Sequence, residues 1–505
     1  MEKLENALTR NQSKAVISIT GIKEKVLSMQ DAWLVLAISI CAILPAWINY
    51  DIISRDGAHL YIPVAKMFLN GEFKEAILSP LRPLFLPLYE FLVFLMARLT
   101  GLGLETSGRL VSVISFLFAA AGLYKVTHIL FQNRAVSYLS VLLLIANREL
   151  LKCSVDCLKE SLLVALVIWG NYFILKGIFS EKRAGFFSTG CMLFIAGGLV
   201  RSTSLIFLAA WGVIWVFHKK TGILIRLLGF LAPIVSIGAL YYLYRHDHWG
   251  LLFFRRSYGL SKLTLIDLDM MTLMNYSLNM IRQFLAKWYY ILAIFGFAGV
   301  YRLRKETYSI FFLLAFTMFF FACSLTGFFF IDRYIIAPVI ALYPLAAYAI
   351  FYSLQSGKTY MKVVAALSIL FCIFLWAGKT FTPPDPGKVA RKEAGMWILS
   401  KIGPEKKILT NRPRIGFYAD TTPFVISKFE SLEKKNQIIA RKTPYWKKET
   451  VRISQLKGKK GLNMALALDM DEESPETKIL AKKLASWKLK PDKTFGNIQV
   501  YLPGP

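Results

Sequence analysis

The sequence predicts a polytopic α-helical membrane protein with a small C-terminal α/β domain, and three observations lead to this fold class. Of the 505 residues, 55% are hydrophobic and only 18% are charged, which is less charge than a soluble protein of this length carries. The apolar residues gather in blocks such as 31–48 and 307–331, and about 20 apolar residues span the hydrocarbon layer as a helix. After residue 380 the composition becomes polar.

The net charge of +29 is explained by membrane topology rather than by nucleic acid. In a soluble protein such a charge would suggest a nucleic-acid partner. Here Lys and Arg cluster in the short loops between apolar blocks, as the positive-inside rule predicts for cytoplasmic loops. We therefore expect no nucleic-acid partner.

These basic loops predict the topology. Residues 1–30 form a cytoplasmic tail, residues 31–380 a transmembrane domain with outer loops at 49–83 and 245–284, and residues 381–505 an extracytoplasmic domain. An odd number of crossings puts the C-terminus outside the cytoplasm of a bacterial inner membrane. The expected helices are 31–48, 108–131, 135–150, 158–177, 186–200, 202–217, 222–244, 285–301, 307–330, 334–353 and 360–379.

Residues 84–100 do not fit this alternation. They are apolar enough to enter the membrane, but one crossing here would turn every later basic loop outward. The segment is therefore either re-entrant or evidence of one miscounted helix nearby, so the total lies at about 11–13 transmembrane helices.

The C-terminal residues alternate between short β-like runs and helical stretches. The β-like runs are 406–410, 415–419, 423–426 and 498–502, and the helical stretches are 390–402 and 476–489. This pattern predicts a small α/β or α+β domain.

An acidic and basic cluster follows the first helix. It contains Asp51, Arg55, Asp56 and His59. A carboxylate at a membrane surface can act as a general base toward an acceptor hydroxyl or amine, or it can coordinate a metal. The alternative is that Asp56 simply caps the helix that follows it.

Further charged residues recur near the expected outer border. Asp156 and Glu160 are four apart and would share one helix face, although a solvated helix start is the alternative. Arg82, Arg201 and Arg333 each suit a phosphate, and lipid head groups are the alternative for all three. Together they suggest a cleft in which cations stabilise a phosphate leaving group and a carboxylate deprotonates the nucleophile.

The chain resembles GT-C glycosyltransferases of the family-39 kind, whose members include protein O-mannosyltransferases and the lipid A aminoarabinose transferase. Each matching stretch is loose alone, and their order along most of residues 30–425 carries the resemblance. The stretches are 55–73 (RDGAHLYIPVAKMFLNGEF), 105–147, 153–166 (CSVDCLKESLLVAL), 197–205 (GGLVRSTSL), 332–350 (DRYIIAPVIALYPLAAYAI) and 408–420 (ILTNRPRIGFYAD).

The resemblance implies a role for each of these residues. Asp56 is implied as the catalytic base, and Glu160 as the second acid with Asp156 as its rival. The resemblance gives the donor phosphate to Arg82 and Arg333, and Arg55 and Arg201 are further candidates for the same role.

The sequence departs from the family at one point that bears on metal binding. Relatives often carry Asp-Glu where this chain has Asp56-Gly57. A divalent metal is therefore left open as cofactor, with Asp51, Asp56 and Glu160 as its ligands if one binds.

The implied reaction is inverting transfer of a sugar from a polyprenyl-phosphate donor, undecaprenyl phosphate being the bacterial carrier. Acceptor protein, lipid and glycan all remain open, as does the sugar, with mannosyltransferase-like activity as one family example. The expected partners are the lipid-linked donor, membrane lipid and the acceptor. The alternative function is a transporter or flippase of an anionic lipid-linked substrate, for which related halves would be expected.

Overall fold

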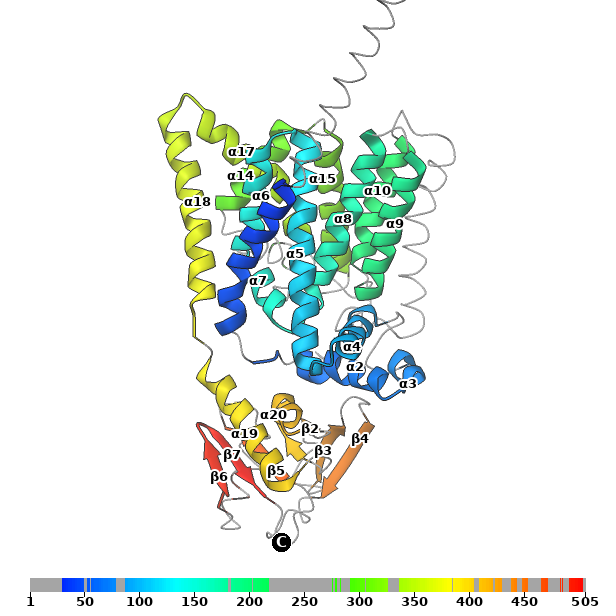
Figure 1. Ribbon diagram of the computed structural model, residues 1–505, viewed down its shortest axis with the longest axis vertical. Coiled ribbons are helices and arrows are strands. Elements are labelled where there is room, and N and C mark those ends of the chain that lie inside the picture. The colour runs from blue at the N-terminus through cyan, green and yellow to red at the C-terminus, as the bar shows by residue number, and fades with distance from the viewer. Residues whose placement is uncertain are drawn as a thin grey trace, which may run out of the picture.

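A computed structural model shows a bundle of helices joined to a small C-terminal domain (Figure 1). The predicted helix 222–244 lies outside the residues that the structure describes, as does the outer loop 245–284 apart from three single positions. The described residues are 30–49, 52–54, 56–78, 87–179, 183–201, 203–217, 275, 278, 282, 291–304, 306–325, 336–383, 385–403, 408–420, 423–428, 437–442, 447–452, 465–470, 482, 484 and 490–502.

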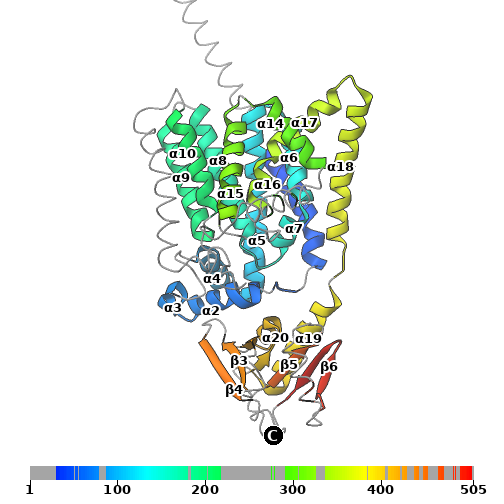
Figure 2. The same cartoon turned by 180° about the vertical axis from the view of Figure 1, so that it is seen from behind.

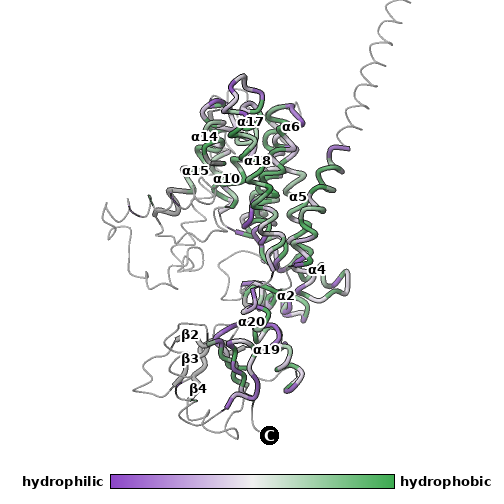
Figure 3. The backbone as a smooth tube through the Cα atoms, turned by 90° about the vertical axis from the view of Figure 1, so that its left-hand side faces the viewer, coloured by the Kyte–Doolittle hydropathy of each residue, from purple (hydrophilic) through white to green (hydrophobic). Residues whose placement is uncertain are grey.

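Four of the described helices are long and apolar enough to cross a membrane. They are the first helix Gln30–Asn49, α5 (Leu104–Phe131), α8 (Glu160–Phe179) and α18 (Thr359–Thr380). Shorter apolar helices complete the bundle: α6 (Arg134–Ala146), α9 (Arg183–Val200), α10 (Ser204–Phe217), α14 (Ile291–Arg302) and α15 (Thr307–Leu325). Hydrophobic residues run along the bundle and hydrophilic ones gather at its ends (Figure 3). The protein is thus a multi-pass membrane protein, as the sequence predicted.

Two expected helices are each broken into two. Residues 135–150 form α6 and then α7 (Arg148–Val155), and residues 334–353 form α16 (Ile336–Ala341) and α17 (Tyr343–Gln355). Asn147 is extended at the first break, where its side chain accepts the Leu150 N–H. Its amide donates to the Tyr343 hydroxyl over 2.7 Å, so the two breaks are joined.

The described part of residues 84–100 forms one helix at an end of the bundle. Their helix α4 (Leu88–Thr100) lies beside η1 (Gly57–Tyr61), α2 (Ile62–Leu69) and α3 (Phe73–Leu78), at the end of the bundle next to the C-terminal domain (Figures 1 and 2).

Turns between helices lie at the opposite end of the bundle (Figure 1). Gln132 ends α5 in the left-handed region with φ 48°, and the Asn133 side chain caps α6 by accepting two backbone N–H groups. The turn between α17 and α18 lies at the same end. Both turns belong to the basic loops that the sequence predicts to be cytoplasmic.

The C-terminal domain is a seven-stranded sheet among the described residues, in the order β4-β3-β2-β1-β5-β7-β6. The central strand β1 runs parallel to β2 and β5, and the outer pairs are antiparallel. The strands are β1 (Ile408–Thr410), β2 (Pro423–Lys428), β3 (Gln437–Lys442), β4 (Lys447–Arg452), β5 (Ala465–Asp469), β6 (Lys493–Phe495) and β7 (Ile498–Tyr501).

Helices α19 (Pro386–Ile402) and α20 (Pro413–Tyr418) complete the domain. The prediction of a strand at 415–419 was wrong, because parallel β1 and β2 need a crossover connection and α20 supplies it. Pro413 begins α20, where a missing N–H costs nothing. The strands expected at 406–410, 423–426 and 498–502 correspond to β1, β2 and β7, and most of 476–489 lies outside the described residues.

Close approach of α14 and α17 depends on Gly299. A Cβ at this position would lie 2.2 Å from the Leu345 carbonyl oxygen, whereas at Gly378 in α18 nothing lies within 4 Å. We predict that Gly299→Ala destabilises the protein by roughly 1–3 kcal/mol through overpacking, and that Gly378→Ala does not. Thermal unfolding in detergent measures both, and equal melting temperatures would contradict the packing described here.

Candidate functional site

A buried carboxylate joins two loops at the end of the bundle that faces the C-terminal domain. Asp156, in the turn between α7 and α8, is 1% exposed. Its Oδ1 accepts the backbone N–H of Ser54 at 2.9 Å and that of Cys157 at 2.7 Å. Burial raises the pKa of Asp156, while the two N–H groups and the charge of Arg414 oppose this shift. Asp156 therefore fixes the loop that follows the first helix.

Gly57 lets the chain pass close to this turn. An added Cβ would lie 2.8 Å from Ile53 Cγ1 and 3.1 Å from Cys157 Cβ, and the Gly57 N–H donates to Ser54 Oγ over 3.0 Å. A larger residue beside Asp56 would push η1 away from the Asp156 turn. This close packing gives a physical reason for the departure from Asp-Glu at this position.

Asp56 stands next to this contact and is only half-buried. It occupies the N-cap position of η1 with helical backbone angles, and its side chain makes no capping hydrogen bond. The alternative that Asp56 serves as a helix cap is therefore wrong. Asp56 and Asp156 are brought to neighbouring loops although they are 100 residues apart in the sequence.

Glu160 and Arg201 form an ion pair. Glu160 begins α8 with a side chain that is 1% exposed, and Arg201 Nη1 lies 3.4 Å from its Oε1. The Arg201 N–H bonds to the Gly197 carbonyl at the end of α9. A Cβ on Gly197 would lie 2.4 Å from Ser204 Oγ, so the tight turn between α9 and α10 sets the position of Arg201.

The other predicted site residues cannot be compared with this geometry. Asp51, Arg55, Arg82 and Arg333 all lie outside the residues that the structure describes. Among the described residues, no group of three or more His, Cys, Asp or Glu side chains converges as a metal site.

The C-terminal domain reaches into this site through Tyr418 at the end of α20. Its hydroxyl accepts the Ile53 N–H at 3.0 Å and donates to Glu105 Oε1 at 3.3 Å. Burial raises the pKa of Tyr418 well above its usual range, and the charge of Glu105 adds to this. An exposed ion pair of 2.8 Å between Lys66 and Asp420 lies in the same interface.

Charged side chains from both domains lie close to one another near Asp156. Burial lowers the pKa of Lys388 in α19, and the charges of Arg414 and Lys152 lower it further, against Asp385 and Asp156. A lysine whose pKa falls because of neighbouring cations is close to them. Lys388 and Arg414 of the C-terminal domain therefore lie near Lys152 and Asp156 of the bundle.

On the bundle side of this site, Arg109 of α5 joins the end of α7 to the first helix. Its Nε donates to the Val155 carbonyl at 3.0 Å and its Nη2 to the Trp47 carbonyl at 2.8 Å. Its guanidinium also lies 4.1 Å from the centre of the Trp47 ring.

Sequence reasoning missed Arg109 and Tyr418, although both lie in stretches matched by the resemblance. For Arg109 a signal existed, because an arginine within an apolar helix is costly without partners. For Tyr418 no local signal existed, since its bond to Ile53 joins residues 365 apart.

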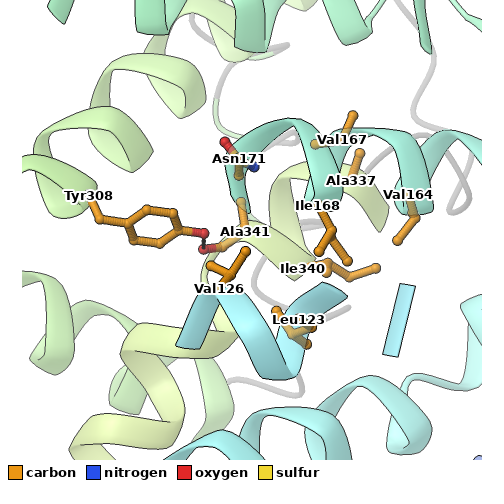
Figure 4. Close-up of a pocket in the computed structure, with 10 residues that line it drawn as sticks. All are labelled: Leu123, Val126, Val164, Val167, Ile168, Asn171, Tyr308, Ala337, Ile340 and Ala341. Carbon is orange, nitrogen blue, oxygen red and sulfur yellow. Dashed lines mark hydrogen bonds between the residues drawn. The ribbon is translucent and has the colours of Figure 1, made fainter. Parts of the chain in front are cut away.

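A small cavity in the bundle core does not belong to this site (Figure 4). It measures about 10 Å³, which is room for about one water molecule. The Tyr308 hydroxyl beside it donates to the Ala341 carbonyl at 2.8 Å, which satisfies that carbonyl where α16 ends.

We predict that Tyr418→Phe loosens the C-terminal domain from the bundle. The change leaves the Ile53 N–H and the Glu105 carboxylate without this partner, at a cost of about 1–3 kcal/mol. Thermal unfolding and proteolysis between α18 and α19 measure the effect. Tyr501→Phe is the matched control, because that hydroxyl bonds only within its own domain to Gln499. Equal protease resistance of both variants would contradict the docking role.

No protein-family model matches the sequence, and no curated protein matches it either. Solved structures do match. ArnT from Cupriavidus metallidurans bound to undecaprenyl phosphate has 13% identity, covering 94% of this chain and 98% of that one, with a TM-score of 0.60. The oligosaccharyltransferase of Archaeoglobus fulgidus with zinc and sulfate has 14% identity, covering 89% and 69%, with a TM-score of 0.53. The oligosaccharyltransferase AglB of that archaeon, with an inhibitory peptide and a dolichol-phosphate, has 13% identity, covering 91% and 71%, with a TM-score of 0.51. The chain therefore has the fold of the GT-C membrane glycosyltransferases.

Proposed function

We propose that this protein is a membrane glycosyltransferase that moves a sugar from a polyprenyl phosphate to an acceptor. The proposal rests on the half-buried carboxylate of Asp56, in a loop that the buried Asp156 holds through the Ser54 N–H, at the end of the bundle that faces the C-terminal domain. The fold supports the same reaction class, since ArnT binds undecaprenyl phosphate and AglB a dolichol-phosphate in their solved structures.

The three carboxylates of the site have different surroundings. Asp156 and Glu160 are each 1% exposed and already hold the Ser54 N–H and Arg201. Asp56 is half-exposed, so an acceptor hydroxyl or amine can reach it. We therefore assign the general base to Asp56, and the positioning of its loop to Asp156.

The chemistry then follows from these positions. Asp56 takes the proton of the acceptor as the acceptor atom attacks the anomeric carbon. The bond from that carbon to the phosphate oxygen breaks, the configuration inverts, and polyprenyl phosphate leaves. Cations stabilise the charge that develops on the phosphate, and the described candidates are Arg201, Lys388 and Arg414.

The alternative of a lipid transporter or flippase gains less support. Transporter sites lie near the bilayer midplane between related halves. Here Asp56 and Asp156 lie at the end of the bundle that faces the C-terminal domain, and Tyr418 of that domain bonds to Ile53 in the same loop as Asp56.

We predict that Asp56→Asn lowers sugar transfer on the order of 10²–10⁴-fold without changing the melting temperature, because the base is lost while the size and shape of the side chain are kept. Membranes receive radiolabelled undecaprenyl-phosphate sugars, and label is counted in protein, lipid and glycan fractions, which also identifies the acceptor. Glu72→Gln, which is half-buried after the turn that ends α2, is the control carboxylate. Transfer by Asp56→Asn at the wild-type rate would rule out this base.

We also predict that the C-terminal domain lies outside the cytoplasm. Single cysteines are introduced into a cysteine-free variant at Met396 in α19 and at Gly357 in the turn before α18, both of which are exposed. An impermeant maleimide should label Met396→Cys in intact cells, and Gly357→Cys only after lysis. The reverse pattern would show that the bundle is inserted the other way.

A further inference from the structure

Two arginines of the C-terminal domain converge on one buried carboxylate. Asp469 is the last residue of β5, and its side chain is 2% exposed. Its Oδ2 accepts hydrogen bonds from Nε of Arg391 at 2.8 Å and from Nε of Arg412 at 3.0 Å. One guanidinium is enough to balance a buried carboxylate, so the second leaves positive charge in excess. The Arg412 side chain is 28% exposed, and this charge can therefore be reached from outside the domain.

Asn411 fixes the two strand ends that carry these groups. Its Nδ2 donates to the Asp469 carbonyl at 2.8 Å, and its Oδ1 accepts the Asp469 N–H at 2.9 Å. Asn411 directly follows β1 and precedes Arg412, so β1 and β5 are joined at their carboxyl ends. The two guanidinium groups are thus held by a carboxylate that is itself fixed to the sheet, as a preorganised site requires.

The topology of the sheet makes this edge a favourable place for a ligand. β1 is parallel to both β2 and β5, so the carboxyl ends of these three strands lie at one edge. The chain leaves β1 toward β2 through α20, whereas it leaves β5 toward β6 and β7 on the other side. Ligands of open α/β sheets bind at the carboxyl ends of the strands, where such connections diverge. Asn411, Arg412 and Asp469 occupy this point.

This edge of the domain faces the bundle. Figure 1 shows α20 on the bundle side of the sheet, and Tyr418 at its end bonds to Ile53. Arg412 precedes the first residue of α20, and the six residues of this helix rise about 9 Å. The arginines therefore lie about one length of α20 from the loop that holds Asp56.

Positive charge is in excess at this edge. Residues 385–393 and 411–414, together with Asp469, carry five cations and three carboxylates. The cations are Lys388, Arg391, Lys392, Arg412 and Arg414, and the carboxylates are Asp385, Glu393 and Asp469. Such an excess attracts an anion. A phosphate group suits it, because the planar fork of a guanidinium matches the spacing of phosphate oxygens.

We propose that the carboxyl ends of β1 and β5 form an anion site in which Arg391 and Arg412 bind a phosphate group of the acceptor. The assignment to the acceptor rests on the proposed function. In that reaction the donor phosphate is bonded to the reacting carbon beside Asp56, whereas this site lies about one length of α20 beyond the contact between Tyr418 and Ile53. A phosphate bound here therefore belongs to the second substrate.

Inorganic phosphate tests the site without any transfer reaction. The full-length protein in phosphatidylcholine nanodiscs is titrated with phosphate against chloride at constant ionic strength, and hydrogen exchange is measured by mass spectrometry. Phosphate should slow exchange in peptides that contain residues 408–412 and 465–469. Half of this protection should need roughly tenfold more phosphate in Arg412→Gln, because a charged hydrogen-bond donor is lost. Lys401→Gln, which is exposed in the last turn of α19, is the control that should match the wild type.

A second variant separates an anion site from a purely structural ion pair. Arg391→Gln should weaken the protection as Arg412→Gln does. Each variant leaves the other arginine on Asp469, so the buried carboxylate keeps a cationic partner. A structural role alone would lower the melting temperature of both variants and leave the phosphate dependence of exchange as in the wild type, which would contradict the anion site.

Two further measurements test whether the phosphate belongs to the acceptor. Label that wild-type membranes transfer from a radiolabelled donor should enter a product that binds to an anion-exchange resin until aqueous hydrofluoric acid cleaves its phosphate ester. Arg412→Gln should lower this label about tenfold, and Lys401→Gln should not. In phosphatidylglycerol nanodiscs, inorganic phosphate should still slow exchange at the edge. Loss of that effect would point to a lipid head group as the occupant and contradict the acceptor.

The outcomes separate this inference from the proposed function. Protection by phosphate that depends on Arg412, without sugar transfer by the wild type, would overturn the proposed function and leave the anion site standing. Sugar transfer with equal protection of the wild type and Arg412→Gln would overturn the anion site alone. A product that carries no phosphate would overturn the assignment of this phosphate to the acceptor.

Discussion

The site depends on one buried carboxylate that accepts backbone N–H groups from two loops. Asp156 lies in the turn before α8 and binds the Ser54 N–H of the loop after the first helix. A hydrogen bond to a charged group contributes about 1.5–3 kcal/mol, and its loss leaves buried groups without partners at further cost. Because Asp56 is two residues beyond Ser54, this bond also sets where the accessible carboxylate stands.

The C-terminal domain is a part of the site rather than an appendage. The crossover between parallel strands β1 and β2 is α20, and Tyr418 at its end bonds to Ile53 and Glu105. The same loop is therefore held from two directions, by Asp156 from the bundle and by Tyr418 from the outer domain. In the proposed reaction, Asp56 is therefore correctly placed only when both parts of the chain are docked.

The sequence predicts the helices well because lipid imposes one rule on every spanning segment. It misses the breaks, since Asn147 ends α6 through a local cap and a bond to Tyr343 that no pattern of apolar residues encodes. It also assigns residues 415–419 to a strand, because propensity cannot anticipate the crossover that parallel strands require.

The sequence predicted the acidic residues of the candidate site, but it did not predict the residues that the C-terminal domain contributes. Asp56, Asp156 and Glu160 stand out because carboxylates are rare in this chain. The contacts of Tyr418 with Ile53 and Glu105, and the effect of Lys152 on Lys388, arise only when the two domains meet.

Differences in burial are the reason that the proposed reaction assigns different tasks to Asp56, Asp156 and Glu160. A carboxylate that is 1% exposed and occupied by N–H groups or a guanidinium, as Asp156 and Glu160 are, stabilises structure but cannot meet an acceptor. A fully solvated carboxylate could contact an acceptor, but the protein would not hold it in a fixed position relative to the acceptor atom. Asp56 meets both conditions, because it is half-buried beside Gly57, whose missing side chain allows the close packing that holds the loop.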